Sequence, residues 1–252
     1  GVRTRDSYMD VLEALAPGGG LVAVVGAGGK KTTLYALADR IDRAIVTATV
    51  RIPIFDSEVA TVEVTPEPVA ALRAAGVDDW PLGLVPERER SDRYLGYDPA
   101  VVDDVAAAGV ADAVLVKADG ARMREFKAPD EREPEVPARS DVVVPVASVH
   151  AVGRPLDEET IHRPARVADV TGRAPGEEIR PRDVAAVLTS PEGGLKDVPG
   201  SATVRPVLNK VDDGELEASA RAVAEQVVEH PDVERVALAR MLADEPLVDV
   251  VS

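Results

Sequence analysis

The eight residues from Gly26 to Thr33 bring together the groups that hold phosphate in many nucleotide-binding proteins. They are Gly26, Ala27, Gly28, Gly29, Lys30, Lys31, Thr32 and Thr33. Glycines let several backbone N–H groups turn inward, the start of a helix adds partial positive charge, a lysine reaches the outer phosphates, and a threonine hydroxyl can hold Mg²⁺. We therefore predict a phosphate-binding loop in which all of these residues contact nucleotide and Thr32 is a magnesium ligand.

Two lysines compete for the phosphate contact. In the usual loop the first glycine stands six residues before the lysine, whereas Gly26 stands five before Lys31 and four before Lys30. We take Lys31 as the catalytic lysine, which puts Lys30 at the position of the usual last glycine; a shifted register would exchange their roles. The alternative is a glycine-rich turn that only joins a strand to a helix, although such a turn has no use for two lysines and two threonines.

A second motif, Asn209-Lys210-Val211-Asp212, directly follows the apolar run Val204–Leu208. In GTP-binding proteins this tetrad recognises guanine: the aspartate accepts from the ring N–H and the exocyclic amino group, and the lysine stem covers the base. The motif predicts that Asn209, Lys210 and Asp212 bind the base of a nucleotide. A turn before a helix capped by Asp212 or Asp213 is the alternative, and both interpretations stay open.

A third motif places an acid after a predicted strand, where Ala113–Val116 is followed by Lys117, Ala118, Asp119 and Gly120. An acidic residue at a strand end beside a phosphate loop commonly supports Mg²⁺. We predict Asp119 as a catalytic residue and a magnesium ligand, although it lies two residues later than the simplest pattern places it. A tight Asp-Gly turn is the alternative.

The charged segment Arg122–Pro137, which follows Asp119, could close over phosphate. Arg122, Arg124 and Lys127 could neutralise phosphate charge there, and we predict Arg122 as catalytic and Lys127 as a nucleotide contact. The alternative is that this segment is a solvated charged surface without a role in binding.

The composition limits the possible partners. The chain of 252 residues carries 45 acidic and 29 basic residues, and its net charge of −16 opposes binding to nucleic acid or to an anionic membrane. No run approaches the roughly 18 apolar residues of a membrane helix, so we expect a cytoplasmic protein. No cysteine is present, and three scattered histidines leave little for a zinc site. The chain is also poor in lysine, like acidic halophilic proteins: it has six, Lys30, Lys31, Lys117, Lys127, Lys196 and Lys210.

The elements that must position these motifs alternate between strands and helices. Apolar or β-branched runs predict strands at Leu21–Val25, Ala44–Val50, Val59–Thr65, Ala113–Val116, Val142–Val146, Val204–Leu208 and Val233–Leu238. Helical patterns occupy Lys31–Ile41, Pro68–Ala75, Pro99–Ala108, Pro181–Leu188 and Glu215–Val228. This alternation predicts a single α/β domain over residues 1–252, of the doubly wound P-loop NTPase type, with a mostly parallel sheet flanked by helices. We expect an irregular, partly helical insertion at about residues 151–202.

The motifs together resemble the selenium-dependent hydroxylase accessory protein family, also called YqeC. The resemblance runs from about Leu21 to Asp212 and includes GAGGKKTT, the segment VKADGARMREFKAPDEREPEVP, then HAVGRPL, IHRP, SPEGGLK and LNKVD. It implies a P-loop nucleotide-binding protein associated with maturation of molybdenum hydroxylases, with the hydroxylase or its maturation factors as partners. The family usually has one lysine after the glycine pair and a glutamate before ADGA, where this chain has Lys30-Lys31 and Lys117.

We expect a Mg²⁺-dependent nucleotide-binding protein, a slow GTPase or other NTPase whose nucleotide state gates an interaction during metallocofactor assembly. GTP is favoured and ATP is possible. One alternative is a phosphoryl or nucleotidyl transferase that acts on a small cofactor precursor, with Arg122–Lys127 as the acceptor site. Another is a non-catalytic cofactor chaperone or binding module.

Overall fold

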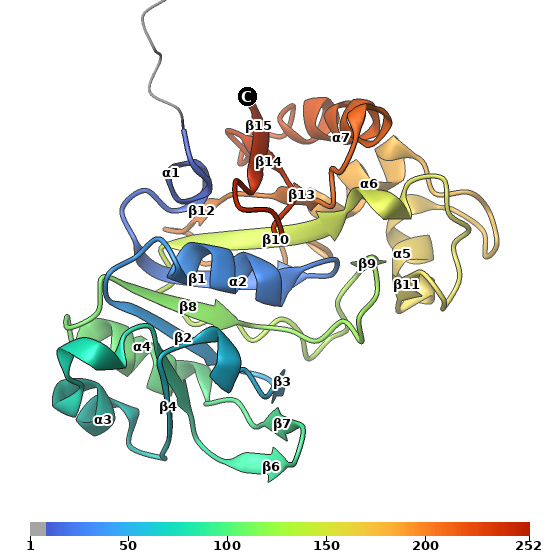
Figure 1. Cartoon of the computed structure of the whole chain (residues 1–252). Helices are drawn as coiled ribbons and strands as arrows, with labels where there is room; N and C mark the ends of the chain where they lie inside the picture. Colours follow the sequence, from blue (N-terminus) through green and yellow to red (C-terminus); the bar gives the residue numbers. More distant parts are fainter. Residues whose placement is uncertain (1–8) are drawn as a thin grey trace, which may run out of the picture.

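The computed structural model describes residues 9–252, and a ten-stranded sheet runs through it (Figure 1). Its strands are β1 (Gly20–Gly26), β2 (Ala44–Ala48), β4 (Thr61–Val64), β5 (Leu82–Val85), β8 (Ala113–Lys117), β10 (Val142–Ser148), β12 (Thr203–Val204), β13 (Val207–Asn209), β14 (Val236–Ala239) and β15 (Leu247–Val251). Their order is β15-β14-β13-β10-β1-β8-β2-β5-β4, with β12 beside β10. All pairings are parallel except that of β15 with β14. The predicted mostly parallel α/β sheet is confirmed.

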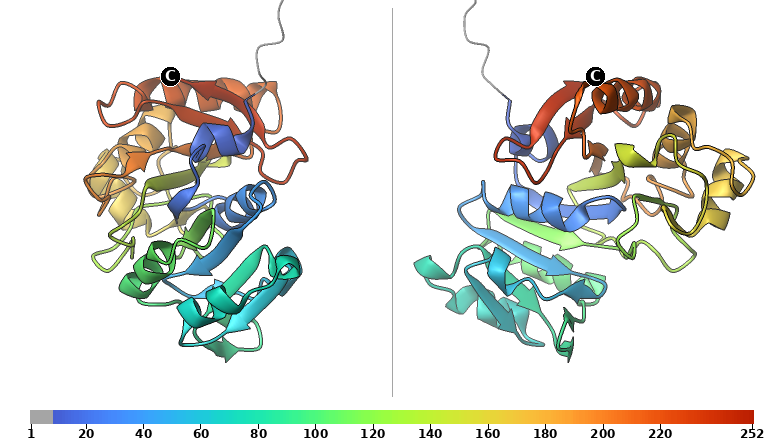
Figure 2. Two further views of the ribbon diagram at one scale, coloured as in Figure 1. Left: turned by 90° about the vertical axis from the view of Figure 1, so that its left-hand side faces the viewer. Right: turned by 45° about the vertical axis from the view of Figure 1, so that its right-hand side comes forward.

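Helices cover both faces of this sheet (Figure 2). They are α1 (Val11–Leu15), α2 (Lys30–Ala38), α3 (Pro68–Ala74), α4 (Pro99–Ala107), α5 (Pro164–Thr171), α6 (Pro181–Leu188) and α7 (Gly214–Val227), with short 3₁₀ turns η1 (Asp56–Glu58), η2 (Val77–Asp79) and η3 (Val149–Ala151). Two small sheets join β9 (Phe126–Lys127) to β11 (Ile161–His162), and β7 (Arg93–Tyr94) to β3 (Ile52–Pro53) and β6 (Arg88–Arg90).

The alternation of side chains along the strands divides the core between the two faces. On one face, Leu34 and Leu37 of α2 pack with Val24 and Leu115. On the other, α3 and α4 pack against β1, β5 and β8, while α6 and α7 cover β13 and β14. Because parallel strands are buried on both faces, they read in the sequence as continuous apolar runs.

Some predicted elements differ from the observed ones. The run Val204–Leu208 was predicted as one strand, but it forms β12 and β13 on either side of Arg205 and Pro206. Proline has no N–H for a sheet ladder, so Pro206 interrupts the strand. Sequence patterns also missed α1, β5, the hairpin of β6 and β7, and the antiparallel edge strand β15.

The topology gathers the predicted motifs at one edge of the sheet. The loops after β1, β8 and β13 all leave from the carboxyl ends of parallel strands. In the sheet β1 lies next to β8, and one strand, β10, separates β1 from β13. Ligands of doubly wound sheets bind in the crevice outside these ends. Segment 151–202 supplies β11, α5 and α6 beside the same edge.

Candidate functional site

The loop between β1 and α2 contains a row of backbone donors that no protein acceptor satisfies within residues 9–252. Gly28 and Gly29 have φ values of 103° and 129°, and a Cβ on Gly28 would lie 2.5 Å from the backbone nitrogen of Ser148. Within residues 9–252, the amides of Gly28, Gly29, Lys30, Lys31 and Thr32 donate to no protein acceptor. Five consecutive free N–H groups at the start of a helix form an anion-binding cradle.

The remaining residues of the loop hold it in shape. The amide of Ala27 donates to the carbonyl of Val146 at 3.0 Å. The hydroxyls of Thr32 and Thr33 donate to the carbonyl of Gly29 at 2.9 and 2.8 Å, and Thr33 is fully buried. Thr32 therefore keeps the more accessible hydroxyl of the pair.

The two candidate lysines point in different directions. Lys30 is buried, and its Nζ lies 2.6 Å from Oδ1 of Asp119 and donates to the carbonyl of Gly26 at 2.6 Å. Lys31 is partly exposed, with its Nζ 4.0 Å from the sulfur of Met123. Lys30 is thus part of the buried cluster, whereas Lys31 keeps its charge available at the mouth of the loop.

Asp119 is the centre of that cluster. Its Oδ2 accepts from the Gly26 amide at 2.9 Å and lies 3.3 Å from Nζ of Lys127, and only 2% of its side chain is exposed. Burial alone would raise the pKa of Asp119, but the ammonium groups of Lys30 and Lys127 hold it below its ordinary value. In turn, burial lowers the pKa of Lys30 in spite of Asp119. Asp119 therefore bridges the strand end, the phosphate loop and β9 as an ionised carboxylate.

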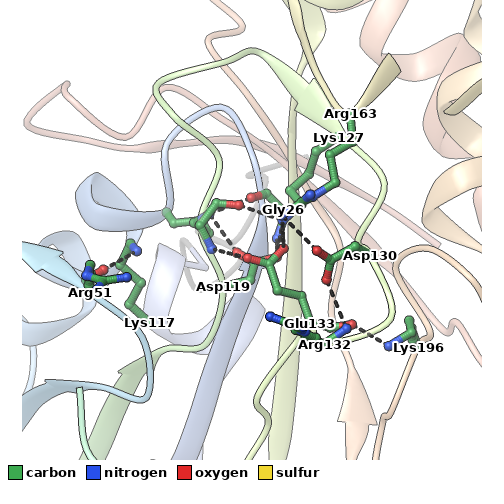
Figure 3. Close-up of polar contacts among 12 residues, drawn as sticks. Gly26, Arg51, Lys117, Asp119, Lys127, Asp130, Arg132, Glu133, Arg163 and Lys196 are labelled. Carbon is green, nitrogen blue, oxygen red and sulfur yellow. Dashed lines mark hydrogen bonds and ion pairs between the residues drawn. The ribbon is translucent and has the colours of Figure 1, made fainter. Parts of the chain in front are cut away.

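Lys127 reaches this cluster from the charged segment after Asp119 (Figure 3). Its side chain is 1% exposed and its Nζ bonds the carbonyl of Gly120 and Oε2 of Glu133, the latter at 2.6 Å. Glu133 also accepts from the Gly120 amide at 3.3 Å, and its backbone carbonyl accepts from Lys196. For Lys127, the interpretation as a solvated surface residue is wrong, because its charge is buried among these partners.

Arg122 behaves differently from Lys127. It is exposed, and it and Met123 both adopt left-handed backbone conformations, with φ of 48° and 61°. Arg124 donates to the carbonyl of Glu158 at 2.7 Å. The role predicted for Arg122 stays a prediction, since its side chain lies outside the cluster.

The Asn-Lys-Val-Asp tetrad adjoins the phosphate loop. The buried amide of Asn209 donates to the carbonyl of Gly28 at 2.9 Å and accepts from the Met241 amide at 3.0 Å. Lys210 lies 2.7 Å from Glu125, which belongs to the charged segment. Asp212 is 57% exposed, with Oδ2 3.4 Å from Nε2 of His150.

The helix after the tetrad is capped by the following residue. Asp213 accepts from the Leu216 amide at 2.8 Å as the N-cap of α7. The capping role therefore belongs to Asp213, which leaves the carboxylate of Asp212 free of that task.

Comparisons with known proteins identify the family of the chain. The sequence profile of a family described as YqeC protein matches residues 22–165. The chain belongs to the YqeC family. A relative from Escherichia coli (strain K12), described as "Uncharacterized protein YqeC", is 30% identical over 183 residues, which is 71% of each chain. No solved structure matches the chain significantly. Among residues 9–252, no helix is both long and apolar enough to span a membrane.

One residue of the site, Lys117, was not predicted to be functional in this YqeC-family chain. It ends β8 with 7% exposure, and its Nζ donates to the carbonyl of Arg51 at 2.8 Å. Burial, together with the nearby charge of Lys30, lowers the pKa of Lys117 to about 7. Its place at a strand end in a chain so poor in lysine was the signal that could have indicated it.

All six lysines of the chain belong to this one region. Lys30, Lys31 and Lys127 are near enough to lower the pKa of Lys117 by their charge. Lys196 contacts the backbone of Glu133, and Lys210 contacts Glu125, whose carbonyl accepts from Ser148 beside Gly28. Lys30, Lys127, Lys196 and Lys210 are paired with carboxylates. Within residues 9–252, Lys31 and Lys117 have no acidic partner, so their charges are the ones left to attract an anion toward the amides of the loop.

Proposed function

We propose that this YqeC-family protein binds a nucleoside triphosphate, with its phosphates in the loop Gly26–Thr33. The observation that carries the proposal is the row of five amides at the start of α2 that have no acceptor in the described part of the chain, with Lys30, Lys31 and Lys117 nearby. Helix N-termini with such amides favour phosphate groups. Lys31 supplies the exposed charge that contacts the outer phosphates, and Lys30 holds the loop to Asp119.

The base lies on the side of Asn209. This residue joins the phosphate loop to the tetrad, so a nucleotide with its phosphates at Gly28 has its base near Lys210 and Asp212. An ionised carboxylate only accepts hydrogen bonds, and guanine offers two adjacent donors. We therefore favour GTP over ATP. Lys210 has to leave Glu125 before its stem can cover the base, which also frees the charged segment to move.

Turnover is expected to be slow. Phosphoryl transfer to water needs a group that orients the attacking water. The carboxylates of the cluster, Asp119 and Glu133, are both paired with lysines, and a carboxylate held in an ion pair is a weak base. The protein is thus suited to a nucleotide-dependent switch, and the family resemblance suggests maturation of a molybdenum hydroxylase as the process in which it acts.

Calorimetric titration of the full chain with GTP, ATP, CTP and UTP tests the proposal. We expect GTP to bind at least about tenfold more tightly than the others, and Lys31→Met to weaken GTP binding by a similar factor or more. Arg43→Met is the matched control, because it removes one exposed positive charge beside β2 at the opposite end of the sheet. The proposal fails if no nucleotide binds, or if both variants bind like the parent.

Release of free phosphate without an acceptor identifies an NTPase. Phosphate release that requires an added small acceptor would point to a transferase instead. If nucleotide binds tightly and no phosphate is released with or without an acceptor, the protein is a nucleotide-dependent binding protein and not an enzyme of either kind.

A further inference from the structure

Asp119, one of the two residues predicted to hold Mg²⁺, is not free to bind a divalent cation. Magnesium in P-loop proteins is held by the hydroxyl of the loop and by a carboxylate at the end of a neighbouring strand. Here Asp119 is already bonded to Lys30, Lys127 and the Gly26 amide, and it is almost fully buried. Within residues 9–252, no three His, Cys, Asp or Glu side chains are grouped so that they could hold a metal ion.

The local charge also opposes a divalent cation. The buried ammonium groups of Lys30 and Lys127 contact the buried carboxylate of Asp119. The buried ammonium of Lys117 adds a third positive charge that is near enough to interact with it. Glu133 compensates part of the excess, but it is already paired with Lys127. A divalent cation that entered here would be repelled, whereas a polyphosphate would be attracted.

Lys117 stands where a strand-end acid would hold the metal. It lies opposite Val24 of β1 and Ala48 of β2 in the sheet register. Along β8 it shares a face with Ala113 and Leu115, which pack in the core cluster that includes α2. Leu34 and Leu37 of α2 pack in the same core cluster, so Lys117 lies on the face of the sheet that α2 covers. Its ammonium points to the backbone of Arg51, beside the cluster around Asp119 (Figure 3).

We propose that the ammonium of Lys117 takes the place of Mg²⁺, so that this protein binds triphosphate without a divalent cation. This inference rests on the proposed function. An ammonium has three N–H donors, and that of Lys117 donates to one acceptor within residues 9–252, the carbonyl of Arg51. The remaining donors can turn to phosphate oxygens. The negative charge of a bound triphosphate favours the protonated side chain, and the ammonium then neutralises phosphate charge as a metal would.

The test is titration of the full chain with GTP, once in excess EDTA and once in excess Mg²⁺. We expect the two dissociation constants of the parent to agree within about threefold. Lys117→Met should weaken binding in EDTA by about tenfold or more, since it removes the charge and keeps the length. Lys117→Glu should bind GTP poorly in EDTA and regain binding in Mg²⁺, because it restores a strand-end acid. Arg43→Met, which makes the same charge change as Lys117→Met, should leave both constants unchanged.

The outcomes separate this inference from the proposed function. If the parent binds GTP at least about tenfold more tightly with Mg²⁺ than with EDTA, the inference is overturned and the proposed function stands. If GTP binds under neither condition, both fail. Unchanged binding by a folded Lys117→Met also overturns the inference. Circular dichroism checks the folding of each variant, and the comparison of EDTA with Mg²⁺ in the parent decides even if one variant does not fold.

Discussion

The two ends of the candidate nucleotide site are built in opposite ways. At the phosphate end, Lys30, Asp119 and Lys127 are at most 5% exposed by side chain and have committed partners. At the base end, Lys210 and Asp212 are 35% and 57% exposed, and they form pairs with Glu125 and His150 that solvent can reach. A buried charge strongly destabilises the fold unless it is paired, whereas an exposed ion pair contributes little to the free energy of unfolding and its members change partners easily.

This difference separates stability from recognition. Substitution of a buried residue of the Asp119 cluster should strongly lower the free energy of unfolding. Substitution of the exposed Lys31, or of an exposed residue at the base end, should change binding with little effect on stability. Asn209 belongs to both, because it is buried and joins the two ends.

The largest effect is expected at Lys30. Lys30→Met removes a partner of the buried Asp119 carboxylate, which should lower the free energy of unfolding by about 3–5 kcal/mol. Lys31→Met removes an exposed charge and should change it by less than about 0.5 kcal/mol. Urea unfolding followed by circular dichroism measures both. Equal losses in the two variants would contradict the division between a buried and an exposed lysine.

The next effect is a pH dependence at Asp119. Its pKa in the folded state is lowered, so its ion pairs stabilise the protein above about pH 4 and lose that contribution as the pH falls further. Asp119→Asn should therefore be much less stable than the parent at pH 7, and the difference should narrow below pH 4. Urea unfolding at a series of pH values gives the two curves.

Asp244→Asn is the control for that series. Asp244 is exposed, and its carboxylate has no hydrogen bond or ion pair within residues 9–252. Its difference from the parent should stay constant with pH. A gap between Asp119→Asn and the parent that does not narrow in acid would mean that Asp119 is not held as a carboxylate in the folded protein.

A smaller effect is expected at the residue that joins the two ends. Asn209→Ala removes the bonds to Gly28 and Met241, leaving a buried carbonyl and a buried amide without partners, and should destabilise the protein by about 1–3 kcal/mol. It should also weaken GTP more than inorganic triphosphate, because the loop and the tetrad lose their common anchor. Calorimetry with both ligands measures the difference. Equal weakening of the two would show that Asn209 supports only the phosphate end.

Local patterns in the sequence were enough to place the motifs at one edge of the sheet. Apolar runs predict strands, and the residues after each run then follow from parallel topology. The sequence could not predict the direction of these side chains, because it depends on contacts between residues far apart in the chain. Lys30 turns inward to contact Asp119, 89 positions away, and Lys127 is buried because it lies in β9. The sequence predicted that either Asp212 or Asp213 caps α7. The structure selects Asp213, whose side chain accepts from the Leu216 amide.

The predicted metal site shows a further limit of this reasoning. Thr32 and Asp119 match the residue types that hold Mg²⁺, and residue type alone cannot reveal that the carboxylate is already occupied by two lysines. The sequence did not predict a functional role for Lys117, for a related reason. A lysine in a buried strand end is informative only once its neighbours and its exposure are known.

The smallest effect on stability, and the sharpest effect on recognition, is expected at Asp212. If its carboxylate recognises guanine, Asp212→Asn should weaken GTP by about tenfold, equal to 1.4 kcal/mol, and improve the binding of xanthosine triphosphate, whose ring carbonyl replaces the amino donor. The thermal midpoint should hardly change, because Asp213 caps α7. Asp213→Ala provides the reverse case: loss of the cap should lower stability by about 1 kcal/mol and leave base preference unchanged. Calorimetry with the two nucleotides and a thermal melt of each variant complete the comparison. Equal binding of GTP and ATP by the parent would remove guanine recognition from the base end, and the site would then be defined by its phosphate contacts alone.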